Sequence, residues 1–186
     1  SKSCAFFGND YRWSRSDIVD QVKEQALHLI EENNVDTFYV GSKGRFECDA
    51  YNAVLQIKQD NPSIQIIFVA SSMKEVNDGE RYFDSFIYPD RAAIGYKRWC
   101  IVHRNNWIIE NTDFIISYNQ YEGRAFEVCK RAKNKGVTVI ELADMKRKAN
   151  NAEEKLWEKN IKKILQSLFL TQLLLCCLLY TSDAAD

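Results

Sequence analysis

Histidine and proline are scarce in this sequence of 186 residues, which contains two of each. No two cysteines form a C-x-x-C pair, and with so few histidines the spacing predicts no metal site. A chain able to build its own core has little need of a disulfide framework. We therefore expect reduced, mostly buried thiols in a cytoplasmic protein. The cysteines are Cys4, Cys48, Cys100, Cys129, Cys176 and Cys177.

The chain also lacks an excess of charge of either sign. It carries 25 Lys and Arg against 26 Asp and Glu, a net charge of -1. This balance argues against a nucleic acid partner, because non-specific binding to DNA or RNA needs an overall basic field. Hydrophobic residues make up 46% and charged residues 27%, values typical of a globular domain with a core of its own.

The apolar run 168–180 is too short for a comfortable membrane span and has no basic residue at its end. We expect no membrane segment. Residues 177–186 resemble the translation of a sequencing-library adapter, and we expect them to be read-through from DNA sequencing. The expected organisation is a main domain over residues 1–145 followed by a C-terminal helix within 146–176, beginning near Ala152.

Hydrophobic periodicity predicts alternating strands and helices. Ser14 and Asp17 form a predicted capping box at the start of the first helix. Residues 70–94 show no clean period and are expected to form a long connection. The expected strands are residues 4–7, 36–40, 64–69, 113–118 and 137–141. The expected helices lie at about 14–32, 46–57, 97–111, 123–135 and from 152 onward.

This alternation indicates the α/β class, as a Rossmann-like three-layer sandwich with a five-stranded, mostly parallel sheet. Right-handed crossovers favour the strand order 3-2-1-4-5. In that order the chain reverses between strands 1 and 4. Their carboxyl ends open a crevice there, which is the usual ligand site of open α/β sheets.

Glycine-bearing loops follow several predicted strands, at Gly8, at Gly41 with Gly44, and at Gly123. Glycine lets a ligand approach the backbone, and the free N–H groups of a following helix favour a phosphate. The sequence contains neither G-x-G-x-x-G nor G-x-x-x-x-G-K-[ST]. Dinucleotide binding of the Rossmann type and P-loop ATPase activity are therefore disfavoured, and we expect no cofactor.

Two charged residues are candidates for chemistry at this crevice. Arg104 offers a planar, permanently charged fork for phosphate or carboxylate. Glu127, four residues after Gly123, is suited to act as an acid or base, or to bond a ribose hydroxyl. The residues alone favour a plainer interpretation, a solvated arginine and a glutamate that complements a helix dipole. Tyr118 and Tyr121 are the candidates for stacking on a base.

Four segments resemble, in order and spacing, one bacterial branch of the SLOG superfamily, a group of uncharacterised YpsA-like Rossmann-like domains. They are residues 4–8 (CAFFG), 38–47 (FYVGSKGRFE), 104–107 (RNNW) and 113–118 (DFIISY). The resemblance covers roughly residues 3 to 142. It implies a domain that senses or processes a nucleotide derivative.

A more distant resemblance is to LOG-type phosphoribohydrolases, which cleave the N-glycosidic bond of nucleoside monophosphates. Arg104 with Asn105 resembles their Arg-Lys pair, and Glu127 is similar in position to the glutamate of their G-T-x-x-E motif. The resemblance implies that Arg104 would hold a ribose phosphate and that Glu127 would assist cleavage.

The chain departs from the SLOG branch at three places. Asn9 and Asp10 replace a His-Arg pair after Gly8, Arg124 replaces the second glycine of a Gly-Gly pair, and Glu47 replaces an aspartate. The first change removes two cations from a phosphate loop, and Arg124 is a candidate to supply the missing positive charge.

The function we expect is binding of a nucleotide or nucleotide-sugar derivative, as a sensor or accessory module. The alternatives are a phosphoribohydrolase, with Arg104 and Glu127 as catalytic residues, and a protein-interaction module with a degenerate site. The expected partner is a small molecule, and a homodimer is left open. The expected ligand-binding residues are Gly8, Asn9, Asp10, Gly41, Gly44, Arg45, Glu47, Arg104, Asn105, Tyr118, Gly123 and Arg124.

Overall fold

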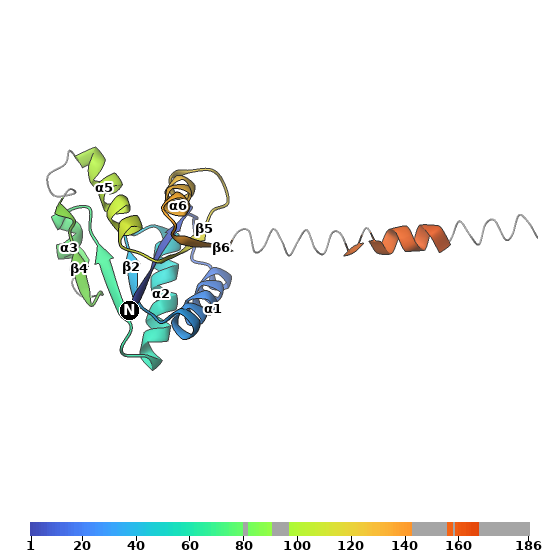
Figure 1. The fold of residues 1–186 in the computed structure, drawn as a ribbon, viewed down its shortest axis with the longest axis horizontal. Helices are drawn as coiled ribbons and strands as arrows, with labels where there is room; N and C mark the ends of the chain where they lie inside the picture. The colour runs from blue at the N-terminus through green and yellow to red at the C-terminus, as the bar shows by residue number, and fades with distance from the viewer. Residues whose placement is uncertain (80–81, 91–96, 143–155, 158, 168–186) are drawn as a thin grey trace, which may run out of the picture. The chain divides into compact units, whose positions relative to one another are not determined.

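The chain divides into two units, Ser1–Ala143 and Asp144–Asp186. No helix in the described part of the chain is both long and apolar enough to cross a bilayer. The computed structural model describes residues 1–79, 82–90, 97–142, 156–157 and 159–167 (Figure 1).

In the second unit, residues 156–157 and 159–167 are helical. The sequence predicts a helix here that begins near Ala152, and its first residues lie outside the described ones. The apolar run 168–180 and the adapter-like residues 177–186 also lie outside the described residues.

One six-stranded sheet forms the centre of the first unit, in the order β4-β3-β2-β1-β5-β6, and its paired strands run parallel (Figure 1). The strands are β1 (Lys2–Gly8), β2 (Val35–Val40), β3 (Gln65–Val69), β4 (Ser85–Ile87), β5 (Phe114–Tyr118) and β6 (Thr138–Glu141). The helices are α1 (Ser16–Asn33), α2 (Arg45–Asp60), α3 (Met73–Gly79), α5 (Lys97–Glu110) and α6 (Arg124–Asn134).

The α/β class and the parallel sheet are confirmed, but the predicted count of five strands is wrong. The five predicted strands correspond to β3, β2, β1, β5 and β6 and lie in the predicted order. The sixth strand, β4, pairs with β3 at the edge of the sheet. It comes from the stretch 70–94, together with the short helix α3. A strand of three residues is too short to show a period-2 pattern.

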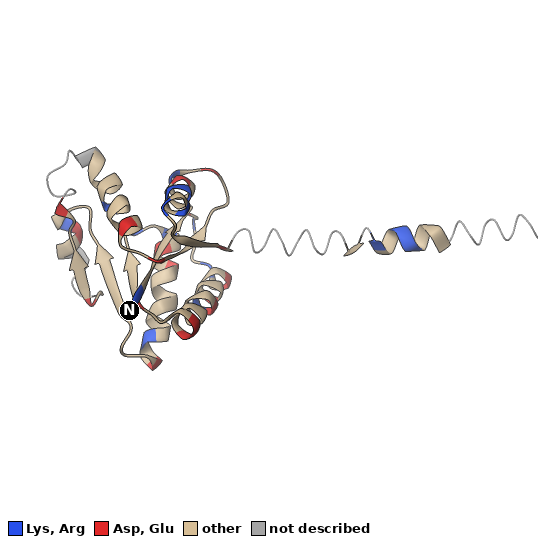
Figure 2. Ribbon diagram, in the orientation of Figure 1, with Lys and Arg blue, Asp and Glu red and all other residues tan. Residues whose placement is uncertain are grey.

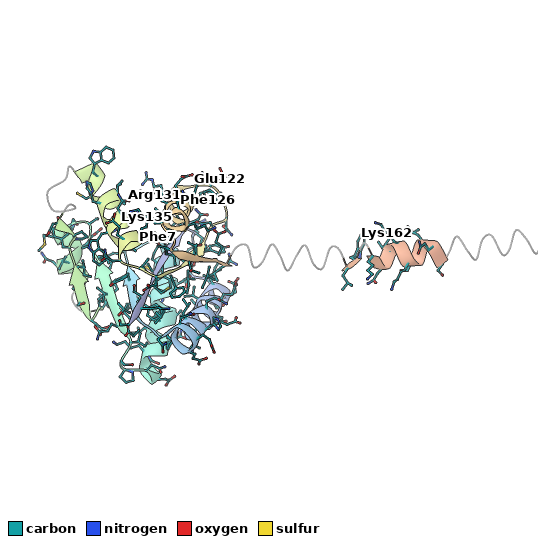
Figure 3. All side chains as sticks on the ribbon, viewed as in Figure 1. Phe7, Glu122, Phe126, Arg131, Lys135 and Lys162 are labelled. Carbon is teal, nitrogen blue, oxygen red and sulfur yellow. The ribbon has the colours of Figure 1, made fainter. Side chains whose placement is uncertain are left out.

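Helices cover both faces of the sheet. Neighbouring side chains of β1 point to opposite faces, so they enter two different cores. Cys4 and Phe6 are buried in a core that also contains the apolar faces of α1 and α2. Ala5 and Phe7 belong to a second core formed with α5 and α6 (Phe7 is labelled in Figure 3). Two buried faces explain why the strand sequence is continuously apolar rather than alternating.

The capping box predicted for the first helix is wrong. α1 begins at Ser16, its N-cap residue is Arg15, and no side chain caps it. The Ser14 hydroxyl instead donates to a carboxylate oxygen of Asp49 at 2.5 Å, and Asp17 pairs with Arg15 at 2.6 Å. The bond to Asp49 ties the Ser14 side chain to α2, and among the described residues that side chain makes no hydrogen bond to the first turn of α1.

Candidate functional site

A cavity of about 230 Å³ lies at the carboxyl ends of β1 and β2. We call it the arginine cavity. β1 pairs with β2 on one side and with β5 on the other, so the cavity lies at the point where the strand order reverses, the usual ligand position in such sheets. Its lining residues are Phe6, Phe7, Gly8, Gly41, Ser42, Glu47, Ile101, Arg104, Asn105, Arg124, Ala125 and Val128.

Residues predicted from distant parts of the sequence come together in this cavity. Those that line it are Gly8, Gly41, Glu47, Arg104, Asn105 and Arg124. The other predicted residues lie outside its lining, namely Asn9, Asp10, Gly44, Arg45, Tyr118, Gly123 and Glu127.

Arg104 on α5 is the most unusual group in the cavity, because its guanidinium is buried with only 5% of the residue exposed. Nε and Nη2 both donate to Oδ1 of Asn105, at 3.1 and 3.0 Å. Among the described residues, no carboxylate forms an ion pair with Arg104 and Nη1 makes no hydrogen bond. A buried cation with only a neutral partner is costly, and an anion entering the cavity would offset that cost.

Burial lowers the pKa of Arg104, and the negative charges of Glu75 and Glu47 act in the opposite direction. The pKa direction thus agrees with the geometry: the site leaves the positive charge only partly compensated.

Glu47 is the one carboxyl-bearing residue among the described residues that line the arginine cavity. It lies in the first turn of α2 and is 7% exposed. Burial raises the pKa of Glu47, although backbone N–H groups, the Ser42 hydroxyl and the charge of Arg104 act to lower it. The cavity therefore holds a fixed cation beside a carboxyl group that keeps its proton to higher pH than usual.

Replacing Glu47 by glutamine is expected to stabilise the protein increasingly as the pH rises. The raised pKa means that the folded state binds more protons than the unfolded chain, so wild-type stability falls as pH rises above the ordinary glutamate value of 4.5. Melting temperatures of the wild type and E47Q between pH 4 and 8 should converge in acid and separate toward pH 8, with E47Q the more stable.

Asp84→Asn serves as the control of opposite sign. Burial acts to raise the pKa of Asp84, but the Ile66 N–H and Lys58 outweigh it and lower that pKa. Its contribution to stability is thus present above the ordinary value of 3.8 and lost in acid. D84N should therefore be less stable than the wild type near pH 8. A constant gap between wild type and E47Q at every pH would contradict the account of Glu47.

The N-terminus of α6 adds positive potential beside the cavity. Its N-cap is Gly123, which offers no side-chain cap, so the first N–H groups of the helix are left for other partners. Arg124 and Ala125, the first two residues of the helix, line the cavity. Basic residues also gather farther along α6 (Figure 2). This end of the cavity favours a negative group.

Gly41 allows α5 to come close to the end of β2. A Cβ atom at this position would lie 2.6 Å from Cδ1 of Ile108 and 3.4 Å from Nε of Arg104. The missing side chain therefore leaves room for Ile108, which lies one turn after Arg104 on α5. Gly44 likewise leaves room for the Glu47 carboxyl group, since a Cβ at Gly44 would lie 2.6 Å from Oε2 of Glu47.

Asn9 and Asp10, predicted as ligand-binding residues, bond to the protein itself. Oδ1 of Asn9, a buried residue, accepts hydrogen bonds from the N–H groups of Gln120 and Tyr121 at 2.5 and 3.0 Å. Oδ1 of Asp10 accepts from the N–H of Arg45 at 2.6 Å, in the first turn of α2. Asn9 thus holds the loop after β5, and Asp10 supplies the negative group at the N-terminus of α2.

Tyr118 is also part of the interior. It is 2% exposed, and its ring packs on Phe46 with centroids 6.1 Å apart. Its hydroxyl accepts hydrogen bonds from Arg15, at 2.8 Å, and from the side chain of Gln120. By contrast, Tyr121, the other stacking candidate, is 60% exposed. The side chains of Arg45 and Glu127 are exposed as well.

Asp49 is a residue whose role was not predicted from the sequence. It is 1% exposed and accepts hydrogen bonds from Tyr11 Oη at 2.7 Å and from the Arg15 N–H at 3.0 Å, in addition to the Ser14 hydroxyl. Burial and the Asp49 carboxylate together raise the pKa of Tyr11. The sequence does carry a signal for this role. Asp49 lies three positions after Phe46 on the apolar face of the predicted helix, and a buried carboxylate there needs hydrogen-bond donors around it.

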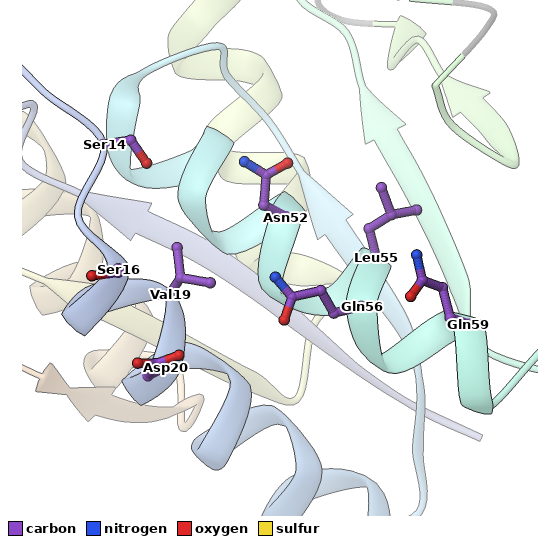
Figure 4. A pocket seen from close by; sticks show the side chains of 8 residues that line it. All are labelled: Ser14, Ser16, Val19, Asp20, Asn52, Leu55, Gln56 and Gln59. Atoms are coloured by element: carbon purple, nitrogen blue, oxygen red, sulfur yellow. The ribbon is translucent and has the colours of Figure 1, made fainter.

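A larger hollow of about 600 Å³ lies between α1 and α2 (Figure 4). The described side chains that line it are mainly neutral and polar, and Asp20 is the one charged residue among them. Because this described lining contains no basic residue, it offers an anion no counterpart to Arg104. The lining is Ser14, Ser16, Val19, Asp20, Asn52, Leu55, Gln56 and Gln59.

No protein-family model matches the chain, and no curated protein sequence matches it. The geometry and the charges of the arginine cavity are therefore the basis on which a function is proposed.

Proposed function

We propose that the arginine cavity binds the phosphate group of a small ligand, a nucleotide or nucleotide-sugar derivative, and that the protein acts as a sensor or accessory module. The observation that carries this proposal is the buried guanidinium of Arg104, whose one hydrogen-bonding partner among the described residues is the neutral oxygen of Asn105. A phosphate suits this group because its oxygens accept charge-assisted hydrogen bonds from a guanidinium fork.

The surroundings of Arg104 support a phosphate rather than a carboxylate-bearing peptide. The cavity is small, at about 230 Å³, and the N-terminus of α6 and Arg124 add positive potential at one end. Glu47 and Ser42 at the other side are polar partners for the hydroxyl groups of a ribose.

The geometry favours binding over the hydrolytic alternative. Glu127, the residue that the distant resemblance implies as the group assisting cleavage, is exposed and does not line the arginine cavity. The carboxyl group present there belongs to Glu47. We therefore expect no release of free base when the protein is incubated with nucleoside monophosphates.

A thermal-shift titration with ribose 5-phosphate, AMP, UDP-glucose and inorganic phosphate tests the proposal. A ligand that binds the folded state stabilises it by about 2.7 kcal/mol at one hundred times its Kd. We expect a dose-dependent rise in melting temperature with at least one of the organic phosphates. If none of them shifts the melting temperature, the interaction module with a degenerate site becomes the better account.

A further inference from the structure

A second cavity, of about 290 Å³, lies next to the arginine cavity. We call it the aromatic cavity. Ser42 and Glu47 line both cavities, so the two adjoin at the first turn of α2. Together their volumes fall within the range of roughly 300 to 1,000 Å³ usual for ligand pockets. The aromatic cavity is lined by Val40, Ser42, Lys43, Glu47, Cys48, Tyr51, Asn52, Tyr82 and Phe83.

The wall formed by the aromatic residues is held in place. The Tyr51 hydroxyl donates to the backbone carbonyl of Tyr82 at 2.8 Å. The rings of Tyr51 and Phe83 lie 5.2 Å apart at their centroids, and Phe83 packs on Phe68 of the core with centroids 4.9 Å apart. Tyr82 keeps 64% of its surface exposed at the edge of the cavity. An exposed tyrosine on an anchored backbone suits stacking on a flat ring.

This inference rests on the proposed function: we infer that the aromatic cavity takes the base of the same nucleotide whose phosphate binds beside Arg104. The order of groups across the two cavities matches that of a nucleoside phosphate. A cationic end is followed by Glu47 and Ser42, which suit the ribose hydroxyls, and then by the aromatic wall. A base attached to that ribose is the flat, weakly polar group that such a wall accepts.

Binding titrations with AMP, GMP, CMP, UMP and ribose 5-phosphate test the inference. At least one nucleotide should bind at least about tenfold more tightly than ribose 5-phosphate, because stacking of a base on an aromatic side chain provides a gain of that size. Tyr82→Ala should remove that gain and leave the affinity for ribose 5-phosphate unchanged. Tyr121→Ala is the matched control, because Tyr121 is similarly exposed, at 60%, but lines neither cavity.

The outcomes separate this inference from the proposed function. If ribose 5-phosphate binds and no nucleotide binds more tightly, the base does not use the aromatic cavity and the inference is wrong. The inference is also wrong if the tighter binding of the nucleotide persists in Tyr82→Ala or is lost in Tyr121→Ala. If none of the five compounds binds, the inference is wrong, and if UDP-glucose does not bind either, the proposed function fails with it.

Alkylation of Cys48 provides a second measurement that needs no variant. Cys48 lines the aromatic cavity and is partly buried, and burial raises the pKa of its thiol, so labelling by iodoacetamide near pH 9 should be slow. The tightest nucleotide should slow the labelling of Cys48 several-fold, whereas ribose 5-phosphate should not. Cys100, which lines neither cavity, should react at the same rate throughout. Equal protection of Cys48 by ribose 5-phosphate would contradict the inference.

Discussion

Gly8→Ala is expected to destabilise the protein by about 3 kcal/mol and to lower its melting temperature by roughly 10 °C. A Cβ atom at Gly8 would lie 2.4 and 2.5 Å from Cδ1 and Cγ of the Phe46 ring. That ring is fully buried and stacks on Tyr118, so it cannot shift without disturbing the core around it. The measurement is thermal or urea unfolding of the purified variant.

Gly123→Ala is the control for this experiment. A Cβ there would lie 3.1 Å from Cε2 of Tyr121, whose exposed side chain is free to shift. The backbone at Gly123 is extended, which alanine adopts without strain. G123A should therefore lose less than about 1 kcal/mol. Equal losses in the two variants would show that the packing of Phe46 against β1 is not as tight as described.

Arg104→Gln is expected to weaken binding of phosphorylated ligands by about 100-fold, because removing the charged partner of a buried anion costs roughly 2 to 5 kcal/mol. The affinity of Arg104→Lys should lie between those of the wild type and Arg104→Gln, since lysine keeps the charge and loses the planar fork. Isothermal titration with ribose 5-phosphate compares the three proteins directly.

Arg45→Gln is the matched control, since Arg45 is exposed and lies outside the arginine cavity. Its affinity for ribose 5-phosphate should equal that of the wild type. The ligand-free R104Q protein should also be as stable as the wild type or more so, since burial lowers the pKa of Arg104 and the charged form costs folding energy. A large loss of stability in R104Q would indicate that Arg104 serves the fold instead of a ligand.

The sheet could be predicted because its signal is local and repeated. Each of the five predicted strands contains a short apolar run, and the helices between them show one-face periodicity, as in Phe46, Ala50, Ala53 and Ile57 of α2. Right-handed crossovers then leave few strand orders. β4 has no such signal in its three residues, and its pairing with β3 depends on tertiary context alone.

The candidate site could be predicted only in part, because loop position alone does not say which way a side chain points. Gly8, Gly41 and Arg104 meet at one cavity, as the sheet topology predicts. Tyr118 follows the pleat to the side of α1 and α2 and becomes core. Asn9 satisfies backbone N–H groups of the loop after β5, a demand that no sequence pattern shows.

Crystals soaked with ribose 5-phosphate at a concentration that saturates binding in solution provide the most direct test of the central claim. The account predicts density for the phosphate group within hydrogen-bond distance of the Arg104 guanidinium, near the first N–H groups of α6. A phosphate found elsewhere, for example in the hollow between α1 and α2, with the arginine cavity empty, would contradict it.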